Sequence, residues 1–545
     1  MSNHSVISTK GLAVTAALTA ASMLAAASTS VAASQGPGHT AKPARHGLIS
    51  AHASASTLVV DTSFIVDSVD PARDLDPTGY LVDHVCYDTL LTLQGSGTKP
   101  VPDLATSYNA SPNAKVYTFH LRHGVKFSNG QPLTSADVVF SLTRVVKLNS
   151  APAYLLAGIT AKAAGPYTVI LRSKTPNPAI PSILTSPALG IVSAAQVKAH
   201  GGSASKNDHA GQYLDSTSAG TGPYTLSSFS TNDQITLTAN PNYWGRKPAF
   251  QKVVLRNMTA PTQLLNVQRG GNQIALDLSS QQAETLSRNS QVQIRTAASP
   301  NVFFLQVTSD PKVSATLANP DIREAIRYGL DYQGMVATAG TGAIQSAGVI
   351  PAQFLGGLPR ADAVKQNIAK AKQLVSASGI KDPSAVLSYP SDISVNGLSF
   401  ATLAQRVQYD LGQIGIKISV QAVPVSPFLT AYSADKYQMV QSYWGPDYPD
   451  PNDYLVFLPG SSVSTRMDWQ SSANPGLVKL GAAAGSTSNN SKRASLFMQM
   501  QKQLNQNSPY FPMIQPAEAI VGSANLTGLN LNPSWVLDVA SVGTK

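Results

Sequence analysis

Three aspartates lie close together in the stretch SYWGPDYPDPNDYL, residues 442–455, of a chain in which only 12% of the residues are charged. Carboxylates at this density can be solvated turn residues, metal ligands, a pair of catalytic acids or the receptor for a cationic group. Asp450 and Asp453 stand in settings typical of turn residues, whose side chains bond local amides. Asp447 follows Trp444, whose ring offers a cation an apolar or cation–π wall.

An enzyme is disfavoured. The chain has no G-x-S-x-G nucleophile turn, no H-E-x-x-H zinc motif and no phosphate-cradling glycine motif. Asp447 and Asp450 stand in one proline-rich turn, whereas the two carboxylates of a glycoside hydrolase must flank the scissile bond from two sides. The one cysteine, Cys86, has the apolar and aromatic neighbours typical of a buried structural thiol. We therefore expect no catalytic residue and no cofactor.

Metal and nucleic-acid binding are disfavoured as well. All nine histidines lie at or before His209, and His120 and His123 have the wrong alternation to share one face of a strand. The 39 lysines and arginines outnumber the 29 acidic residues and give a net charge of +10. These basic residues are scattered singly, so no basic arm or basic helix face is present. We expect neither a metal site nor a nucleic-acid partner.

The N-terminal region has the three-part order of a secretory signal. Residues 1–33 contain Lys10, an apolar segment over 11–27 and small residues before a plausible cleavage point. Residues 34–56 show no periodicity and are typical of a flexible leader. No cysteine stands near the cleavage point, and no later segment reaches 18 consecutive apolar residues. We expect an extracytoplasmic protein without a lipid anchor or a membrane span in the mature chain.

The remaining sequence predicts a mixed α/β protein. Tyr117, Phe119 and Leu121 alternate with polar residues as in a half-buried strand, and Thr134 with Asp137 forms a capping pair ahead of a helix. The hydrophobic pattern further predicts strands over 301–307, 416–423 and 437–444, and helices over 319–332, 367–380 and 403–416. The last strand leads into the acidic stretch, and open α/β sheets place ligands at the carboxyl ends of their strands.

Eight motifs stand in order along the chain. They are LDP (75–77), PVPDLATSYNASPNAKVYTFHLRHGVKFSNGQPLTSADVVFSLTR (100–144), GTGPYTL (220–226), NPNYWGRKP (240–248), PDIREAIRYGLD (320–331), AKQLVSASGI (371–380), LGQIGIKISVQAV (411–423) and WGPDYPDP (444–451). Together they resemble the solute-binding proteins of ABC importers, in the large peptide/nickel-binding family that includes oligopeptide- and dipeptide-binding proteins. A single motif would be weak evidence for this resemblance, but eight motifs in the same order are specific evidence.

The resemblance implies a two-lobed periplasmic-binding-protein fold of the α/β class, type II-like, with an extra inserted domain and hinge closure around the ligand. By this resemblance lobe I combines residues 57–91, 217–298 and 485–545, and the smaller domain is inserted at 92–216. Lobe II comprises residues 299–484.

The same resemblance implies a ligand-binding site. In peptide-binding members an aspartate of the W-x-x-D loop receives the α-ammonium group of the ligand, and Asp447 matches that position. Trp444 and Tyr443 beside it are further candidate contacts. Tyr80 is another, because we expect PTGY (77–80) to form a loop that faces the ligand.

Dipeptide-binding members hold the ligand carboxylate with an arginine near the start of a lobe II helix. Ser399, Phe400 and Ala401 stand at about that place here, and Arg406 comes later. Longer peptides, held through backbone hydrogen bonds like an added strand, therefore fit better.

The expected function is capture of peptides, namely oligopeptides with a free amino terminus, and their delivery to the transmembrane subunits of an ABC permease. The protein is expected to be a monomer in the periplasm, at the exterior of the cell envelope or secreted. Within the family, the alternative is the same fold binding an oligosaccharide or a metal chelate. From another class, the alternative is a secreted glycoside hydrolase.

Overall fold

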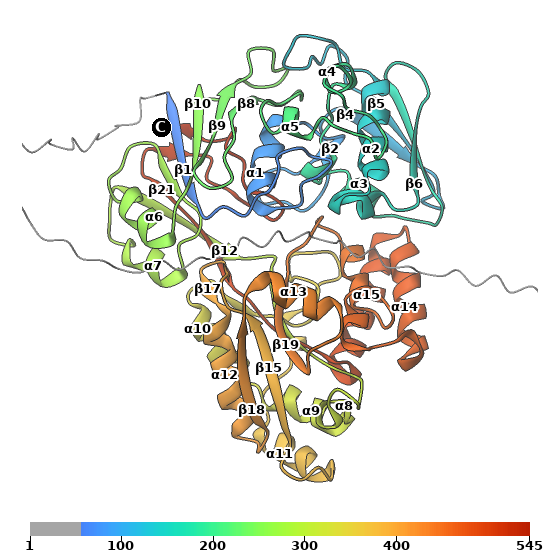
Figure 1. Ribbon diagram of the computed structural model, residues 1–545, viewed down its shortest axis with the longest axis vertical. Helices are drawn as coiled ribbons and strands as arrows, with labels where there is room; N and C mark the ends of the chain where they lie inside the picture. Colours follow the sequence, from blue (N-terminus) through green and yellow to red (C-terminus); the bar gives the residue numbers. More distant parts are fainter. Residues whose placement is uncertain (1–55) are drawn as a thin grey trace, which may run out of the picture. The chain divides into compact units, whose positions relative to one another are not determined.

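Two large β-sheets organise residues 56–545, the part of the chain that the computed structural model describes (Figure 1). The secretory signal predicted for residues 1–33 and all but the last residue of the predicted leader lie outside the described residues. Within residues 56–545, no helix is long and apolar enough to cross a membrane.

The first sheet has seven strands and is mostly antiparallel. Its central strand β1 (Thr57–Thr62) runs parallel to both of its neighbours, β10 and β11. The order across the sheet is β12 (Val292–Ala298), β21 (Ala517–Ser523), β11 (Gln273–Ala275), β1, β10 (Lys252–Asn257), β9 (Gln234–Ala239) and β8 (Tyr224–Ser228).

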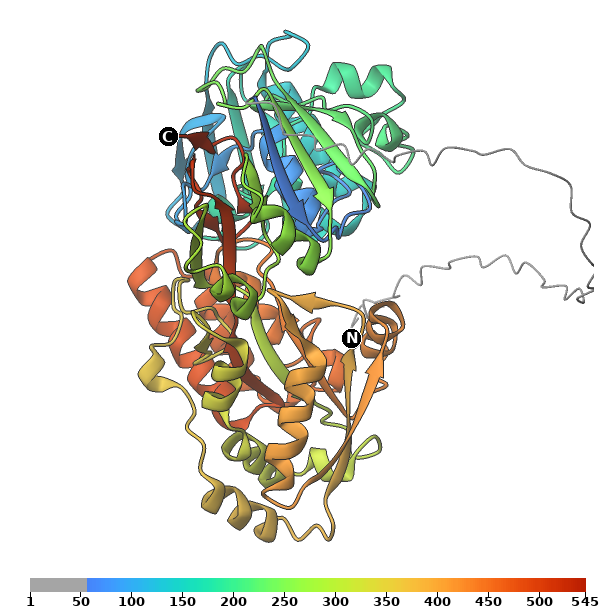
Figure 2. The same cartoon turned by 90° about the vertical axis from the view of Figure 1, so that its left-hand side faces the viewer.

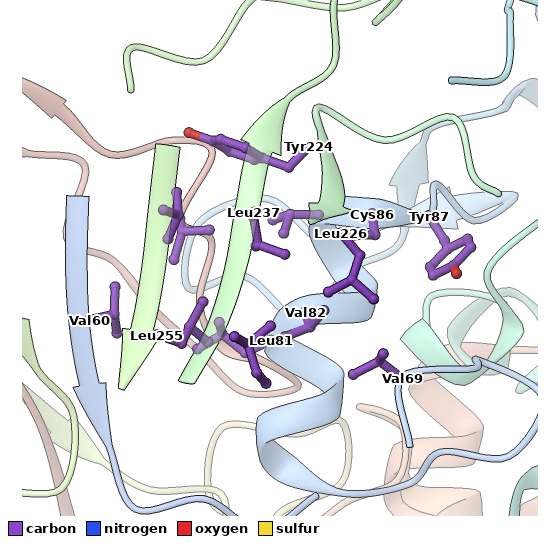
Figure 3. Close-up of a cluster of buried hydrophobic side chains, with 14 of the residues drawn as sticks. Val60, Val69, Leu81, Val82, Cys86, Tyr87, Tyr224, Leu226, Leu237 and Leu255 are labelled. Atoms are coloured by element: carbon purple, nitrogen blue, oxygen red, sulfur yellow. The ribbon is translucent and has the colours of Figure 1, made fainter. Parts of the chain in front are cut away.

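Helix α1 (Pro77–Cys86) packs on this sheet. Figure 3 shows Leu81 and Val82 of the helix directed toward Leu237 and Leu255 of the strands. These side chains are at most 2% exposed. Burying each one contributes about 1.5–3 kcal/mol relative to exposure, which fixes the helix on the sheet.

The PTGY segment (77–80) is the first turn of α1, so the prediction of a loop there is wrong. Pro77 occupies the first helical turn, where a missing N–H costs nothing and the fixed φ favours the helix. A Cβ on Gly79 would lie 2.1 Å from Oδ2 of Asp74, so only glycine allows the preceding loop to approach the helix this closely.

A four-stranded sheet is formed by residues that lie between β1 and β8 in the chain. Its strand order is β4 (Ala105–Ala110), β5 (Val116–Leu121), β7 (Thr168–Ser173) and β6 (Ile159–Ala163). Tyr117, Phe119 and Leu121 of β5 are buried while His120 is exposed, which confirms the predicted alternation. Helix α2 (Ser135–Leu148) begins with the capping box predicted from Thr134 and its partner three residues on.

The second large sheet has six strands. Their order is β14 (Ile344–Gln345), β20 (Tyr510–Gln515), β13 (Val302–Val307), β19 (Met439–Trp444), β15 (Ser384–Pro390) and β18 (Lys417–Val423). The helices predicted beside these strands are present as α9 (Pro320–Gly329), α11 (Ile368–Ala377) and α12 (Phe400–Gly412). In Figure 1 and Figure 2, α12 lies along the sheet, where Leu403 and Val407 are buried.

The remaining helices and the paired two-residue strands lie around these sheets. The other helices are α3 (Ile180–Ile183), α4 (Ala194–Ala199), α5 (Gly211–Leu214), α6 (Ala260–Val267), α7 (Ser280–Thr285), α8 (Ala315–Ala318), α10 (Tyr332–Ala339), α13 (Val425–Ser433), α14 (Pro475–Ser486) and α15 (Asn490–Asn507). Paired two-residue strands are β2 (Leu91–Thr92) with β3 (Val101–Pro102), β16 (Ser394–Val395) with β17 (Leu398–Ser399), β22 (Leu526–Thr527) with β25 (Gly543–Thr544), and β23 (Leu531–Asn532) with β24 (Val536–Leu537).

The chain passes between the two large sheets at two neighbouring points. One crossing joins β12 to β13, and the other joins β20 to β21 at Pro516. The crossings are tied together, since the amide of Ser299 donates to the carbonyl of Pro516 (2.8 Å) and Nε2 of Gln515 donates to the carbonyl of Ser299 (2.7 Å). Two adjacent strand ends of this kind are a typical hinge.

The predicted division into lobe I, lobe II and an inserted domain stays a prediction, but one boundary differs from the sheet connectivity. Lobe I was expected to resume at residue 485. Instead, β20 belongs to the six-stranded sheet, and Phe497 and Leu504 of α15 pack in a core cluster beside it. The chain returns to the seven-stranded sheet only at Pro516.

A buried ion-pair network holds the loop before α1 against α2. The guanidinium of Arg144 donates to Asp70 (2.5 and 2.6 Å) and to Asp208 (2.8 Å twice), and all three side chains are at most 1% exposed. Arg73 contacts the same two carboxylates from a position that is 34% exposed. The arginine at 144 therefore compensates two carboxylates that water cannot reach.

Replacing Arg144 tests this network. We expect Arg144→Leu to lower the free energy of unfolding by about 3–5 kcal/mol, because it leaves buried carboxylates without their cation. The matched variant Arg73→Leu should lose only about 0.2–1 kcal/mol, since solvent screens that pair. Urea denaturation followed by tryptophan fluorescence measures both, and equal losses for the two variants would contradict the assignment.

Candidate ligand-binding site

The candidate site starts at the end of β19. This strand pairs antiparallel with β13, so that Tyr443 stands opposite Phe303 and Trp444 opposite Val302. The ring of Tyr443 packs against Phe303 and Phe400 with centroid separations of 5.9 and 6.1 Å. The acidic stretch therefore leaves the six-stranded sheet from a strand whose last residues are fixed by both backbone pairing and aromatic packing.

Beyond Trp444 the backbone turns at Gly445. A Cβ at that position would lie 2.6 Å from Oδ1 of Asn301, so the close passage of the two segments requires glycine. The chain then returns through a 3₁₀ helix, η4 (Pro451–Phe457), for which Asp450 is the N-cap. We call residues 444–453 the acidic loop.

Asp453 fixes the shape of the acidic loop. Its Oδ2 accepts the indole N–H of Trp444 at 2.9 Å and the backbone N–H of Asp447 at 3.2 Å. Asp453 is 3% exposed, and its pKa is raised well above the usual value, first by burial and then by the charge of Asp447. The side chain is thus held by two N–H donors, and its burial disfavours the charged form.

Asp450 is compensated in another way. Its carboxylate pairs with the guanidinium of Arg493 on α15, with Nη1 2.9 Å from Oδ2 and Nη2 contacting Oδ1. Nη2 also donates to Oδ1 of Asn452 at 2.7 Å. The Asp450 side chain accepts the amide of Asn452 at 2.9 Å, the local turn bond predicted from the sequence. The arginine partner was not predicted.

Asp447 is the third aspartate and the least compensated. It is half-buried, and burial raises its pKa above the usual range, while hydrogen bonds with Tyr154 and Asp453 oppose that shift. In the described part of the chain, no lysine, arginine or histidine is among the groups that act on its pKa or pair with it. Its carboxylate is therefore partly shielded from water and has no cationic partner.

The acidic loop lies against the part of the protein built on the four-stranded sheet. Tyr154 belongs to the 3₁₀ helix η1 (Ala151–Leu156), which packs on α2, and its side chain is 46% exposed. Tyr448 is 8% exposed and packs in the hydrophobic cluster of the four-stranded sheet. Nδ2 of Asn452 is 3.5 Å from Oδ1 of Asn177. Asp447 is thus placed where the six-stranded sheet and the four-stranded sheet meet.

Tyr80 reaches the same region from α1. Its pKa is raised well above the usual value by burial first and by the charge of Asp447 second, which places the phenol near that carboxylate. Its hydroxyl is 3.0 Å from Oγ of Ser186, and the residue is 5% exposed. Tyr80 therefore lines the region as a buried residue whose hydroxyl already has a partner.

All four residues proposed from the sequence gather in this region. Trp444 and Tyr443 lie on the strand that leads into the acidic loop, and Asp447 and Tyr80 interact electrostatically. Their contact with a ligand stays a prediction. Sequence reasoning missed Tyr154, whose segment APAYLL carries no motif, and it missed the structural use of Asp453.

The sequence comparisons identify a family. Residues 99–465 match the family model described as bacterial extracellular solute-binding proteins, family 5 Middle. A curated relative from Escherichia coli (strain K12), the "Probable D,D-dipeptide-binding periplasmic protein DdpA", is 26% identical over 492 residues, which cover 87% of this chain and 92% of the relative.

Solved structures show the same fold. The periplasmic binding protein DppA of Helicobacter pylori, in complex with peptide STSA, superposes with a TM-score of 0.74 at 22% identity, covering 90% of this chain and 98% of that one. NikZ of Campylobacter jejuni, in complex with Ni(L-His), gives 0.72 at 18% identity, covering 90% and 100%. The two-lobed α/β fold expected from the sequence is thereby confirmed, while the ligands of these two proteins differ.

The Asp450–Arg493 pair offers a test of how the acidic loop is held. We expect Arg493→Met to lower the free energy of unfolding at pH 7 by about 3–5 kcal/mol, because Asp450 would stay buried without its cation. The adjacent, exposed Lys492 provides the control, since Lys492→Met should change stability by no more than about 0.5 kcal/mol. Chemical denaturation measures both values, and a loss below 1 kcal/mol for the first variant would contradict the role given to the pair, as such pairs cost roughly 3–5 kcal/mol to break.

Proposed function

Because the chain belongs to the bacterial extracellular solute-binding proteins of family 5, we propose that it captures peptides with a free amino terminus and delivers them to an ABC permease. In this proposal the protein works outside the cytoplasmic membrane, catalyses no reaction and returns empty for another ligand. The DdpA relative and the STSA-bound DppA structure, both described by their names as binding peptides, support the ligand class.

The observation that carries the proposal is the state of Asp447. Of the three aspartates of the acidic loop, Asp450 has a guanidinium and the buried Asp453 accepts two N–H donors, whereas the half-buried Asp447 bonds Tyr154 and Asp453 and has no cationic partner. A half-buried carboxylate without a cation is stabilised by an ammonium group that binds it. Each charge-assisted hydrogen bond of this kind contributes about 1.5–3 kcal/mol.

The surroundings of Asp447 also favour a cation. The pKa of Tyr443 is raised by burial first, then by the charges of Asp447 and Asp76. Carboxylates from the acidic loop and from the residue that precedes α1 thus act on one aromatic side chain. The resulting field attracts ammonium groups and repels free carboxylates.

The family arginine for a ligand carboxylate has no counterpart at the start of α12. Ser399 there caps the helix by accepting the amide of Ala401 at 3.2 Å. Arg406 contacts Asp331 and lies 3.0 Å from Asp410, so its guanidinium is already engaged. This supports peptides longer than two residues, whose backbone is bound as an added strand.

Ligand capture would use the paired crossings at Ser299 and Pro516 as the hinge. Because both crossings are adjacent, rotation about them changes the distance between the acidic loop and η1 without breaking either sheet. A ligand ammonium that replaced the Tyr154 hydroxyl on Asp447 would then favour the closed arrangement.

Ligand-induced stabilisation tests the proposal. A mixed library of tetra- to hexapeptides should raise the melting temperature of the wild-type protein, and Asp447→Asn should abolish this shift because an amide cannot compensate an ammonium charge. The control Asp233→Asn changes an exposed carboxylate on another part of the surface and should keep the shift. N-terminal acetylation of a peptide that binds should lower its affinity for the protein by roughly 10–100-fold.

Differential scanning fluorimetry measures the melting temperatures of the wild type, Asp447→Asn and Asp233→Asn with and without peptide. The melting temperature of unliganded Asp447→Asn confirms that this variant is folded. No shift with any peptide, together with a shift by oligosaccharides or nickel chelates, would replace the peptide by another ligand of the same fold. Hydrolysis of a chromogenic glycoside would contradict the non-enzymatic role.

Peptide affinity should also depend on pH. The pKa of Asp447 is raised by burial, so its charge is lost on acidification at a higher pH than that of an ordinary aspartate. The ligand amine stays protonated throughout this range, and only the charged carboxylate binds it. We expect Kd, measured by calorimetry, to rise as pH falls through the raised pKa, approaching about tenfold per pH unit below it. A Kd that is constant down to pH 4 would contradict the role of this carboxylate.

A further inference from the structure

The short β16–β17 hairpin reaches from one large sheet to the other. It connects β15 of the six-stranded sheet to α12, and its two-residue turn consists of Asn396 and Gly397, with φ values of 50° and 70°. A Cβ on Gly397 would lie 2.5 Å from Cα of Ser279, the N-cap of α7, so this contact requires glycine. We call Asn396 and Gly397 the hairpin tip.

Glu518 receives the hairpin tip. It lies on β21, two residues beyond the crossing at Pro516, and its Oε1 accepts Nδ2–H of Asn396 at 3.2 Å. Oδ1 of Asn396 in turn accepts Nδ2–H of Asn301 at 2.9 Å. Asn301 follows the other crossing, where its backbone amide donates to Oγ of Ser299 at 3.1 Å. One chain of hydrogen bonds therefore joins both crossings through the hairpin tip.

The carboxyl group of Glu518 is buried at this contact. The residue is 8% exposed, whereas Ala297, which is paired with it on β12, is exposed. Paired residues of an antiparallel sheet share one face, so the neighbouring strand does not cover this position. The hairpin tip, which bonds Glu518, contributes the cover. Separating the tip from Glu518 would therefore return the carboxyl group to water.

No cation acts on Glu518. Burial raises its pKa to about 7, the hydrogen bond from Asn396 opposes this shift, and the charge of Asp277 adds to it. On the neighbouring elements, Glu284 of α7 is exposed, and Arg295 of β12 donates to a glutamine of its own strand at 3.0 Å. The carboxyl group is thus neutral in acid and becomes charged near pH 7 while it is still covered.

Charging a covered carboxyl group favours any arrangement in which water reaches it. The pKa of Glu518 beneath the hairpin tip is higher than that of a solvated glutamate, so the covered arrangement binds the proton more tightly. That arrangement is favoured at low pH and is lost as pH rises through about 7. We propose that Glu518 is a positioning residue for the hinge, which holds the hairpin tip while protonated and releases it when charged. This proposal rests on the hinge movement proposed above and not on the class of ligand.

Single-molecule FRET on the unliganded protein tests the release. Dyes on Thr231→Cys and Lys381→Cys report the distance between the parts built on the two large sheets, because Thr231 lies between β8 and β9 and Lys381 precedes β15. Both positions are exposed, and the one native cysteine, Cys86, is buried. We expect a single distance population at pH 6 and a second one that grows above pH 7, with their ratio changing by up to tenfold per pH unit.

Two variants should act in opposite directions. Glu518→Gln cannot become charged, so it should keep the pH 6 population up to pH 8.5. Asn396→Gly retains the left-handed turn but lacks the side chain that bonds Glu518, so it should show the second population already at pH 6. The control Glu284→Gln changes an exposed carboxylate on α7 and should keep the wild-type pH profile.

A pH profile that Glu518→Gln leaves unchanged would overturn the proposal. If that variant does not fold, an Asn396→Gly profile equal to that of the wild type would overturn it instead. A wild-type distance that the tetra- to hexapeptide library changes and pH does not would also overturn it while keeping the hinge. A distance that neither peptides nor pH change would overturn the hinge movement as well.

Discussion

Buried carboxylates need compensation, and the ways in which the acidic loop meets this requirement determine the site. Asp450 is neutralised by the guanidinium of Arg493, and Asp453 accepts two N–H donors while burial raises its pKa. Both arrangements are complete within the protein. Asp447 has no cation, because the side chains that bond it are the hydroxyl of Tyr154 and the carboxyl of Asp453. The first two aspartates build the loop, and the third remains available for a cation.

The fold places this available carboxylate at a junction. Strand β19 carries the loop from the six-stranded sheet to η1 and the four-stranded sheet, while the two crossings at Ser299 and Pro516 are the only points at which consecutive strands of the two large sheets, within residues 56–545, are joined. In the proposed mechanism, rotation about these crossings would change the contacts of Asp447 and leave both sheets intact. Ligand binding and domain movement would then be coupled through this side chain.

Local features of the fold could be predicted from the sequence because they depend on local patterns. The alternation in β5 and the capping box at Thr134 each involve residues only a few positions apart. The prediction of a loop at Pro77 is wrong because a proline and a glycine within four residues are typical of a turn. The packing of Leu81, Val82 and Val85 on the sheet identifies the segment as a helix. A proline at the first helical position is compatible with either structure.

The site could be predicted in part for a similar reason. Trp444 and Asp447 lie in one short motif and matched a family pattern. Arg493 and Tyr154 lie far from the loop in sequence, and neither belongs to a motif, so only the tertiary structure brings them to it. The sequence did not predict the crossing at Pro516 from the six-stranded sheet to the seven-stranded sheet. Strands β20 and β21 are both fully buried, and no polar segment marks the boundary between them.

The most direct measurement is a crystal structure of the protein with a bound tetrapeptide. We predict the terminal nitrogen of the peptide at about 2.7–3.2 Å from a carboxylate oxygen of Asp447, with the Tyr154 hydroxyl displaced from that oxygen. A peptide bound with its amino terminus elsewhere, while Asp447 keeps only its tyrosine partner or faces solvent, would contradict the account.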